Sequence, residues 1–161
     1  MGASQRLHYP QFTLDGGGVW RDATRPLLFL DESEDGFSPN VSFLVEPLAA
    51  PNDTLKAFAN AVLEGLRATQ GLQSLEVHGV TELVVHGRPS CSLVFTFSRP
   101  GPAPKAEPVP FACEQLLIDV APWVISATLT SSAPSFEASQ EQFTKLIGSL
   151  RFRRPQSQAA K

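Results

Sequence analysis

The side chains that could perform chemistry are few, and their spacing fits no catalytic or metal-binding pattern. The three histidines are His8, His78 and His86, and the last two each precede a glycine. This spacing places no two of them on one helical turn and does not match a zinc finger. Cys91 and Cys113 lack the local sequence that marks an activated thiolate. We therefore expect no catalytic residue, no metal site and no cofactor, and hence no enzyme.

Two further segments resemble chemical motifs without completing them. The glycines at 16–18 would need a following helix to bind phosphate, but Val19-Trp20-Arg21-Asp22 comes next and favours a turn. The acidic segment 31–35 is typical of a solvated loop, with a Ca²⁺ site as the weaker alternative. For Cys91 and Cys113 we predict buried thiols, and a disulfide between neighbouring strands is the alternative.

Composition favours one folded domain that binds neither nucleic acid nor membrane. The chain has 161 residues, of which 42% are hydrophobic and 18% charged, and its net charge is -3. A nucleic-acid binder would normally carry a basic stripe. Because the first ten residues contain no apolar leader and no run reaches the ~20 residues of a membrane span, we expect a cytoplasmic protein without stable membrane insertion. Residues 1–154 are predicted to form the domain and 155–161 a disordered tail.

The remaining sequence predicts strands and two helices. Strand-forming runs occupy 7–14, 25–30, 41–45, 75–85, 90–97 and the hairpin 115–132, in which Ala121-Pro122 forms the turn. A proline-rich segment, 99–110, connects two of these strands. One helix should begin near Thr54 and a second near Ser135, each with an apolar stripe. The order predicts an α+β fold: a mainly antiparallel, curved sheet with two amphipathic helices packed against it.

Three segments carry a resemblance to a known family. They are Trp20-Arg21-Asp22-Ala23-Thr24 before a strand, Ser42-Phe43-Leu44-Val45 before the first helix, and the hairpin that ends in Ala-Thr-Leu-Thr-Ser-Ser. In this order the chain resembles the DcrB/PsbP-like family, and within it the Eag chaperones of bacterial type VI secretion effectors. The resemblance implies a homodimer that binds and shields the apolar N-terminal transmembrane helices of a secreted effector before export.

The resemblance also implies where such a client would bind. Leu27, Ser42 and Gln115 match the family's contact positions, whereas Arg25 and Glu46 depart from its pattern. Strand alternation extends these positions to a predicted client-binding groove that comprises Leu27, Phe29, Ser42, Leu44, Gln115, Leu117, Ser126 and Thr128. The groove should be left uncovered by both helices, which should instead meet the opposite-facing Leu28, Val41, Phe43, Leu116 and Ile118. The alternatives are a toxin immunity protein that uses the acidic loop, and a module that binds a small ligand or glycan.

Overall fold

The computed structural model describes residues 6–8, 12–15, 21–24, 27–30, 36–48, 54–101, 103 and 105–152. In chain order its elements are β1 Arg6–His8, β2 Phe12–Asp15, β3 Arg21–Thr24, β4 Leu27–Phe29, β5 Asn40–Pro47, α1 Leu55–Ala68, β6 Gln73–Val85, β7 Arg88–Arg99, β8 Val109–Val120, β9 Trp123–Ser132, a 3₁₀ turn Ala133–Ser135, α2 Phe136–Gly148 and β10 Arg151–Phe152. The proposed tail, 155–161, the acidic segment 31–35 and Arg25 lie outside the described residues.

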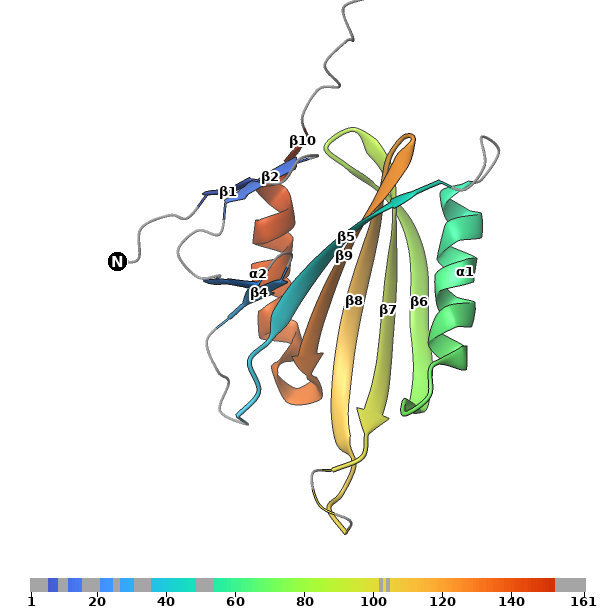
Figure 1. Cartoon of the computed structure of the whole chain (residues 1–161), viewed down its shortest axis with the longest axis vertical. Coiled ribbons are helices and arrows are strands. Elements are labelled where there is room, and N and C mark those ends of the chain that lie inside the picture. Colours follow the sequence, from blue (N-terminus) through green and yellow to red (C-terminus); the bar gives the residue numbers. More distant parts are fainter. Residues whose placement is uncertain are drawn as a thin grey trace, which may run out of the picture.

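The fold is α+β, as predicted, with a curved antiparallel sheet between two helices (Figure 1). The large sheet has seven strands in the order β3-β4-β5-β9-β8-β7-β6, and every neighbouring pair is antiparallel. The proline-rich segment connects β7 to β8, as predicted, but its two ends belong to these strands, because Arg99 of β7 pairs with Val109 of β8 and Ser98 pairs with Pro110. The strand predicted over 75–85 is irregular at Gly79, because the register between β6 and β7 shifts between Val77 and Gly79.

The two ends of the chain form a second, smaller sheet that the sequence did not indicate. The single strand predicted over 7–14 is instead two antiparallel strands, β1 and β2, and β10 pairs with β2 through Phe152 and Phe12. Pro10 stands between β1 and β2 in the sequence, where it supplies no N–H for a continuous ladder. The prediction was therefore wrong in the number of strands, although not in their location.

Helix α1 begins as its sequence predicts. The Thr54 side chain accepts a hydrogen bond from the Ala57 amide at 3.1 Å, which satisfies one of the free N–H groups of the first turn. Ala59 and Leu63 are buried on its apolar stripe, and they pack with Leu93 and Leu117 of the sheet. The helix therefore lies on β7 and β8.

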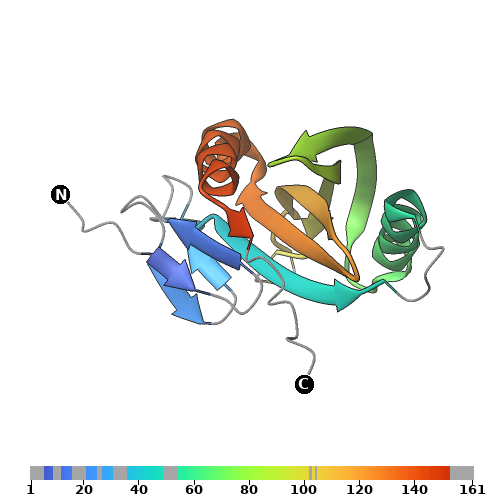
Figure 2. The ribbon, with the colours of Figure 1, turned by 90° about the horizontal axis from the view of Figure 1, so that it is seen from above.

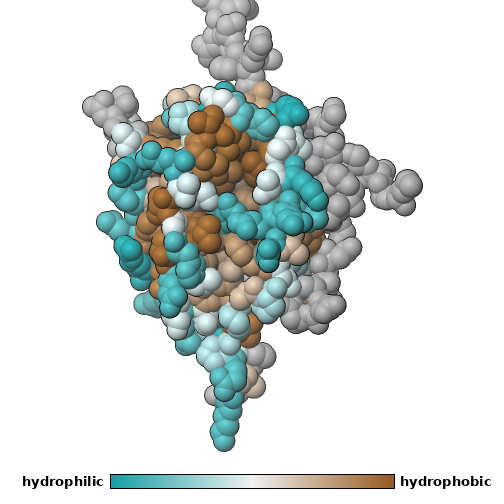
Figure 3. Space-filling view, turned by 180° about the vertical axis from the view of Figure 1, so that it is seen from behind, coloured by the Kyte–Doolittle hydropathy of each residue, from teal (hydrophilic) through white to brown (hydrophobic). Residues whose placement is uncertain are grey.

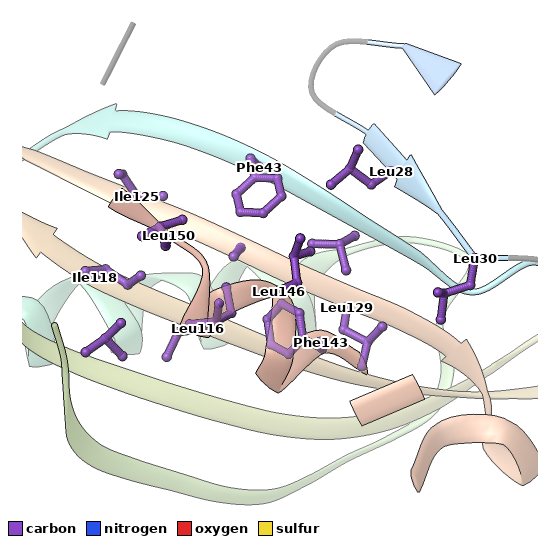
Figure 4. Packing of buried hydrophobic residues seen from close by; sticks show 14 residues of the cluster. Leu28, Leu30, Phe43, Leu116, Ile118, Ile125, Leu129, Phe143, Leu146 and Leu150 are labelled. Atoms are coloured by element: carbon purple, nitrogen blue, oxygen red, sulfur yellow. The ribbon is translucent and has the colours of Figure 1, made fainter. Parts of the chain in front are cut away.

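Helix α2 packs on the opposite face of the sheet. Phe143, Leu146 and Leu150 pack into a core with side chains from β4, β5, β8 and β9, as Figure 4 shows. Ser135 occupies the predicted N-cap position, but its side chain makes no capping hydrogen bond, because a 3₁₀ turn leads directly into the helix. Seen from above, α1 and α2 stand on opposite sides of the sheet (Figure 2). The expectation that both helices leave one face free was therefore wrong.

Candidate functional site

The strand register brings the predicted contact positions into one row across four strands. Leu27 of β4 pairs with Ser42 of β5, Ser42 with Thr128 of β9, and Thr128 with Gln115 of β8. Residues that pair directly in an antiparallel ladder point to the same face. The shared face that the sequence predicted is therefore confirmed for Ser42 and Gln115, and it includes Thr128. For Leu27 the structure gives the backbone pairing with Ser42.

The opposite-facing residues are buried and meet α2, as predicted, but they do not pack with α1. Leu28, Val41, Phe43, Leu116 and Ile118 are all buried, and all belong to the core that contains the buried residues of α2. Successive side chains of each strand thus point alternately into the core that contains α2 and to the face that carries Gln115.

Burial along a second row shows how far α1 covers this face. Leu44 of β5 pairs with Ser126 of β9, and Ser126 pairs with Leu117 of β8. The exposed fraction falls along this row from 56% at Leu44 to 3% at Ser126 and 0% at Leu117. Leu117 is covered by α1, so the prediction that Leu117 and Ser126 line an uncovered groove was wrong. The sequence did not indicate on which side of the sheet α1 would pack.

What remains uncovered is a band of mixed chemistry, which we call the open face and define by Ser42, Leu44, Gln115 and Thr128. Ser42, Gln115 and Thr128 are half-buried, and Leu44 is exposed. Phe29 is also half-buried and lies two residues after Leu27 on β4, whereas the side chain of Leu27 lies outside the described part of the structure. The open face combines apolar area with hydroxyl and amide groups.

Gln115 is held in place by a neighbour on the next strand. Its Nε2 atom donates a hydrogen bond to Ser126 Oγ at 2.7 Å. Buried Ser126 thus acts as a support rather than as part of the contact surface. The bond uses one amide proton and leaves the Gln115 carbonyl oxygen directed elsewhere; among the described residues no hydrogen bond to that oxygen is present. The side chain can therefore accept a hydrogen bond from a bound partner.

One end of the open face is acidic. Glu46 of β5 and Asp119 of β8 both pair with Val124 of β9, so they point to the same face and are separated by one strand. Two strand spacings place their backbones roughly 10 Å apart. Both side chains are half-buried, and Asp119 Oδ1 accepts a hydrogen bond from the Ala121 amide at 2.9 Å. We call Glu46 and Asp119 the acidic pair. Glu46 is one of the two positions at which the sequence departs from the pattern of the family that it resembles.

The cysteines are buried thiols, as predicted, and the register excludes a disulfide between them. Cys91 pairs with Leu117, whereas Cys113 pairs with Phe95, four positions further along the same two strands. Four positions correspond to roughly 13 Å, well beyond the reach of a disulfide. Burial raises the pKa of the Cys113 thiol to about 11, and burial together with the charge of Glu82 raises the pKa of Cys91. Neither thiol has the low pKa of a nucleophile.

The histidines take part in separate polar contacts. His78 Nε2 lies 2.7 Å from Thr96 Oγ1 on the neighbouring strand, and His86 Nε2 lies 3.1 Å from the Ile147 carbonyl oxygen. His86 lies in the turn between β6 and β7, whereas His78 belongs to β6. No group of three or more metal-ligating side chains occurs within the described ranges. In the same part of the chain, no helix is long and apolar enough to cross a membrane.

Comparison with known proteins identifies the fold. No family model and no curated protein matches the chain. Among solved structures, PA94 from Pseudomonas aeruginosa, a protein of unknown function, is 18% identical with a TM-score of 0.63, over 96% of this chain and 99% of PA94. The PsbP of the cyanobacterium Synechocystis is 13% identical with a TM-score of 0.62, over 95% and 94% of the two chains. LpqN, involved in cell envelope biogenesis of Mycobacterium tuberculosis, is 13% identical with a TM-score of 0.62, over 94% and 91%.

Proposed function

We propose that the chain, whose fold is PsbP-like, is a non-enzymatic chaperone that binds apolar helices of a client protein on its open face. The observation that carries this proposal is the position of exposed Leu44 beside the half-buried row of Ser42, Thr128 and Gln115, on sheet surface that neither helix covers. The resemblance to Eag chaperones supplies the finer proposal. The client is the N-terminal transmembrane region of a type VI secretion effector, shielded in the bacterial cytoplasm before export.

The chemistry of the open face suits a helix that is destined for lipid. Such a helix presents about 20 apolar residues that water does not tolerate. Helices of this kind associate through close packing of small residues and through hydrogen bonds from Ser, Thr, Asn or Gln side chains. Ser42 and Thr128 can donate or accept, and the Gln115 carbonyl oxygen can accept. Leu44 offers apolar contact area beside them, as does Phe29.

The acidic pair adds a preference for one kind of flanking sequence. Transmembrane helices are commonly flanked by lysine or arginine on their cytoplasmic side. A cationic flank that lay beside Glu46 and Asp119 would set the direction of the bound helix, since complementary charge specifies orientation more than affinity. We therefore propose a client whose apolar segment carries basic residues at one end.

Co-expression with a model client tests this function. The client is a soluble reporter protein that carries an N-terminal segment of about 20 leucine, alanine, glycine and serine residues with a lysine flank. We expect the wild-type chain to increase the soluble fraction of the reporter. Leu44→Asp should abolish the increase, because a carboxylate placed against apolar helix surface costs several kcal/mol when it is unpaired.

Val84→Asp is the matched control, since Val84 is 70% exposed and belongs to the edge strand β6 rather than to the open face. It should protect the reporter as well as the wild type does. If Leu44→Asp protects the reporter equally well, the open face is not the binding surface. The homodimer implied by the same resemblance remains part of the proposal, and sedimentation of the purified chain measures it independently.

A further inference from the structure

The edge strand β6 offers an unoccupied row of backbone hydrogen-bonding groups. It has 13 residues, and within the described residues it pairs only with β7, since it is the last strand of the seven-stranded sheet. In such a strand alternate residues direct their N–H and C=O groups away from the sheet, which makes it a template for a further strand. Val80 and Val84 are 47% and 70% exposed along it.

A groove runs beside this edge, between the first turns of α1 and the second half of β6. Its volume is about 950 Å³, and its lining includes Leu55 and Lys56 of α1 together with Val80, Glu82 and Val84 of β6. Val80, Glu82 and Val84 are alternate residues of one strand, so they point to the same face, the one that carries α1. Figure 3, which views the molecule from the side where β6 lies, shows hydrophobic surface gathered there.

An edge strand flanked by a groove under a helix has the geometry of strand-addition sites. A segment that extends the sheet satisfies its backbone groups on β6 and directs every second side chain into the groove. The apolar lining of the groove on the strand favours apolar side chains at those alternate positions. A folded, globular partner could contact the exposed valines. It would form hydrogen bonds with the outward N–H and C=O groups of β6 only if it had an exposed strand of its own.

The charge of β6 distinguishes the occupant from a second copy of this chain. The strand contains Glu76 and Glu82 and no lysine or arginine. Glu82 pairs with Cys91 and Glu76 with Thr96, so the two carboxylates point to opposite faces of the sheet. Two copies joined edge to edge would bring two carboxylates to each face of the seam, with no cation supplied by either strand, and like charges opposite each other across strands are destabilising. A foreign segment that carries a lysine or arginine on the same face as its apolar residues would instead complement Glu82, which points to the groove.

We propose that β6 and the groove beside it bind an extended segment of a partner protein as an added strand. The alternate residues of this segment that face the groove are apolar except for at least one, which is basic. This surface is separate from the open face and does not depend on the function proposed for that face. The edge of β6 would bind the backbone of the extended segment, and the groove would bind every second side chain of that segment.

The test uses the full chain and a synthetic peptide, acetyl-Thr-Val-Thr-Lys-Thr-Val-Thr-amide, which carries its lysine on the same face as its two valines. It is titrated to about 1 mM, a range that detects weak complexes. Two isomers each carry three N-methyl groups, one at positions 2, 4 and 6 of the peptide and the other at positions 3, 5 and 7, so each loses N–H groups on one peptide edge. We expect one isomer to bind like the parent and the other to bind at least about tenfold more weakly. Val80→Lys and Val84→Lys should weaken parent binding by a similar factor, whereas Leu44→Lys on the open face should not.

Amide hydrogen exchange of β6 is a second measurement, and it distinguishes strand addition from binding by side chains alone. A peptide that only inserted side chains into the groove would not slow the exchange of alternate β6 amides. We expect the bound peptide to slow exchange at alternate residues of β6 between Val80 and Val84. Equal binding of both N-methylated isomers, no binding by the parent peptide, or slowed exchange without alternation would each overturn the proposal. Concentration-dependent protection of β6 in the absence of peptide, removed by Val80→Lys, would identify a second copy as the occupant and would overturn it as well.

Discussion

Leu44, Ser126 and Leu117 form one row across the sheet, and α1 covers only the Leu117 end of it. Substitution by alanine should therefore lower the free energy of unfolding much more at Leu117 than at Leu44. Leu117 is fully buried against Ala59 and Leu63 of α1, whereas Leu44 is 56% exposed. Leu117→Ala removes buried side-chain carbons and leaves a cavity beneath the helix, at a cost of about 2–5 kcal/mol. Leu44→Ala removes a side chain that is already largely in water, so the free energy of unfolding should change by less than about 1 kcal/mol.

Thermal and urea unfolding measure this difference. For a chain of this length each kcal/mol shifts Tm by about 2–4 °C, so a loss of about 3 kcal/mol at Leu117 lowers Tm by roughly 6–12 °C. Leu44→Ala should leave Tm nearly unchanged. Loss of stability in Leu44→Ala as large as in Leu117→Ala would refute the reasoning, since it would mean that Leu44 is covered and that the open face is closed. A small effect of Leu117→Ala would show that α1 does not pack there.

Two further predictions concern groups away from the open face. Cys113 has a pKa raised by burial to about 11, above the usual value for a thiol. The unfolded chain therefore releases this proton first, so stability should fall by about 2–3 kcal/mol from pH 9 to 11, and the decline should be smaller in urea titrations of Cys113→Ala. Glu114 accepts hydrogen bonds from Ser92 and Gln140, each at 2.8 Å, and so joins β7 and β8 to α2. Glu114→Ala should destabilise the chain by about 1–2 kcal/mol in urea unfolding, while Gln140→Glu, which keeps the length but repels the carboxylate, should destabilise it similarly.

Much of the sheet could be predicted because each strand carries its own pattern. The alternation of Leu116 and Ile118 with Gln115 separates the two faces before any pairing is known. Short turns, such as the one at Ala121-Pro122, then favour antiparallel neighbours, and the observed pairing of β8 with β9 confirms this. Thr54 could be assigned as a cap because its role depends only on residues within the next turn.

The side of the sheet on which each helix packs could not be predicted from such local patterns. The stripe of α1 is apolar whichever face it meets, and both faces of β8 include leucine, as Leu116 and Leu117 show. The choice depends on the path of the chain between β5 and α1, which no periodicity encodes. For this reason Leu117 is predicted from the sequence to line the uncovered client-binding groove, whereas in the structure α1 buries it. Pairing of β10 with β2 was missed for a related reason, since it joins the two ends of the chain.

The central claim, that the open face binds apolar helices of a client, is tested most directly by photo-crosslinking. A photoreactive amino acid replaces Ser42, Leu44 or, as a control, the exposed Lys145 on α2, and each variant is co-expressed with the reporter that carries the apolar segment. The account predicts crosslinks from positions 42 and 44 to the apolar segment and none from position 145. Crosslinks from position 145 with none from positions 42 and 44 would contradict it.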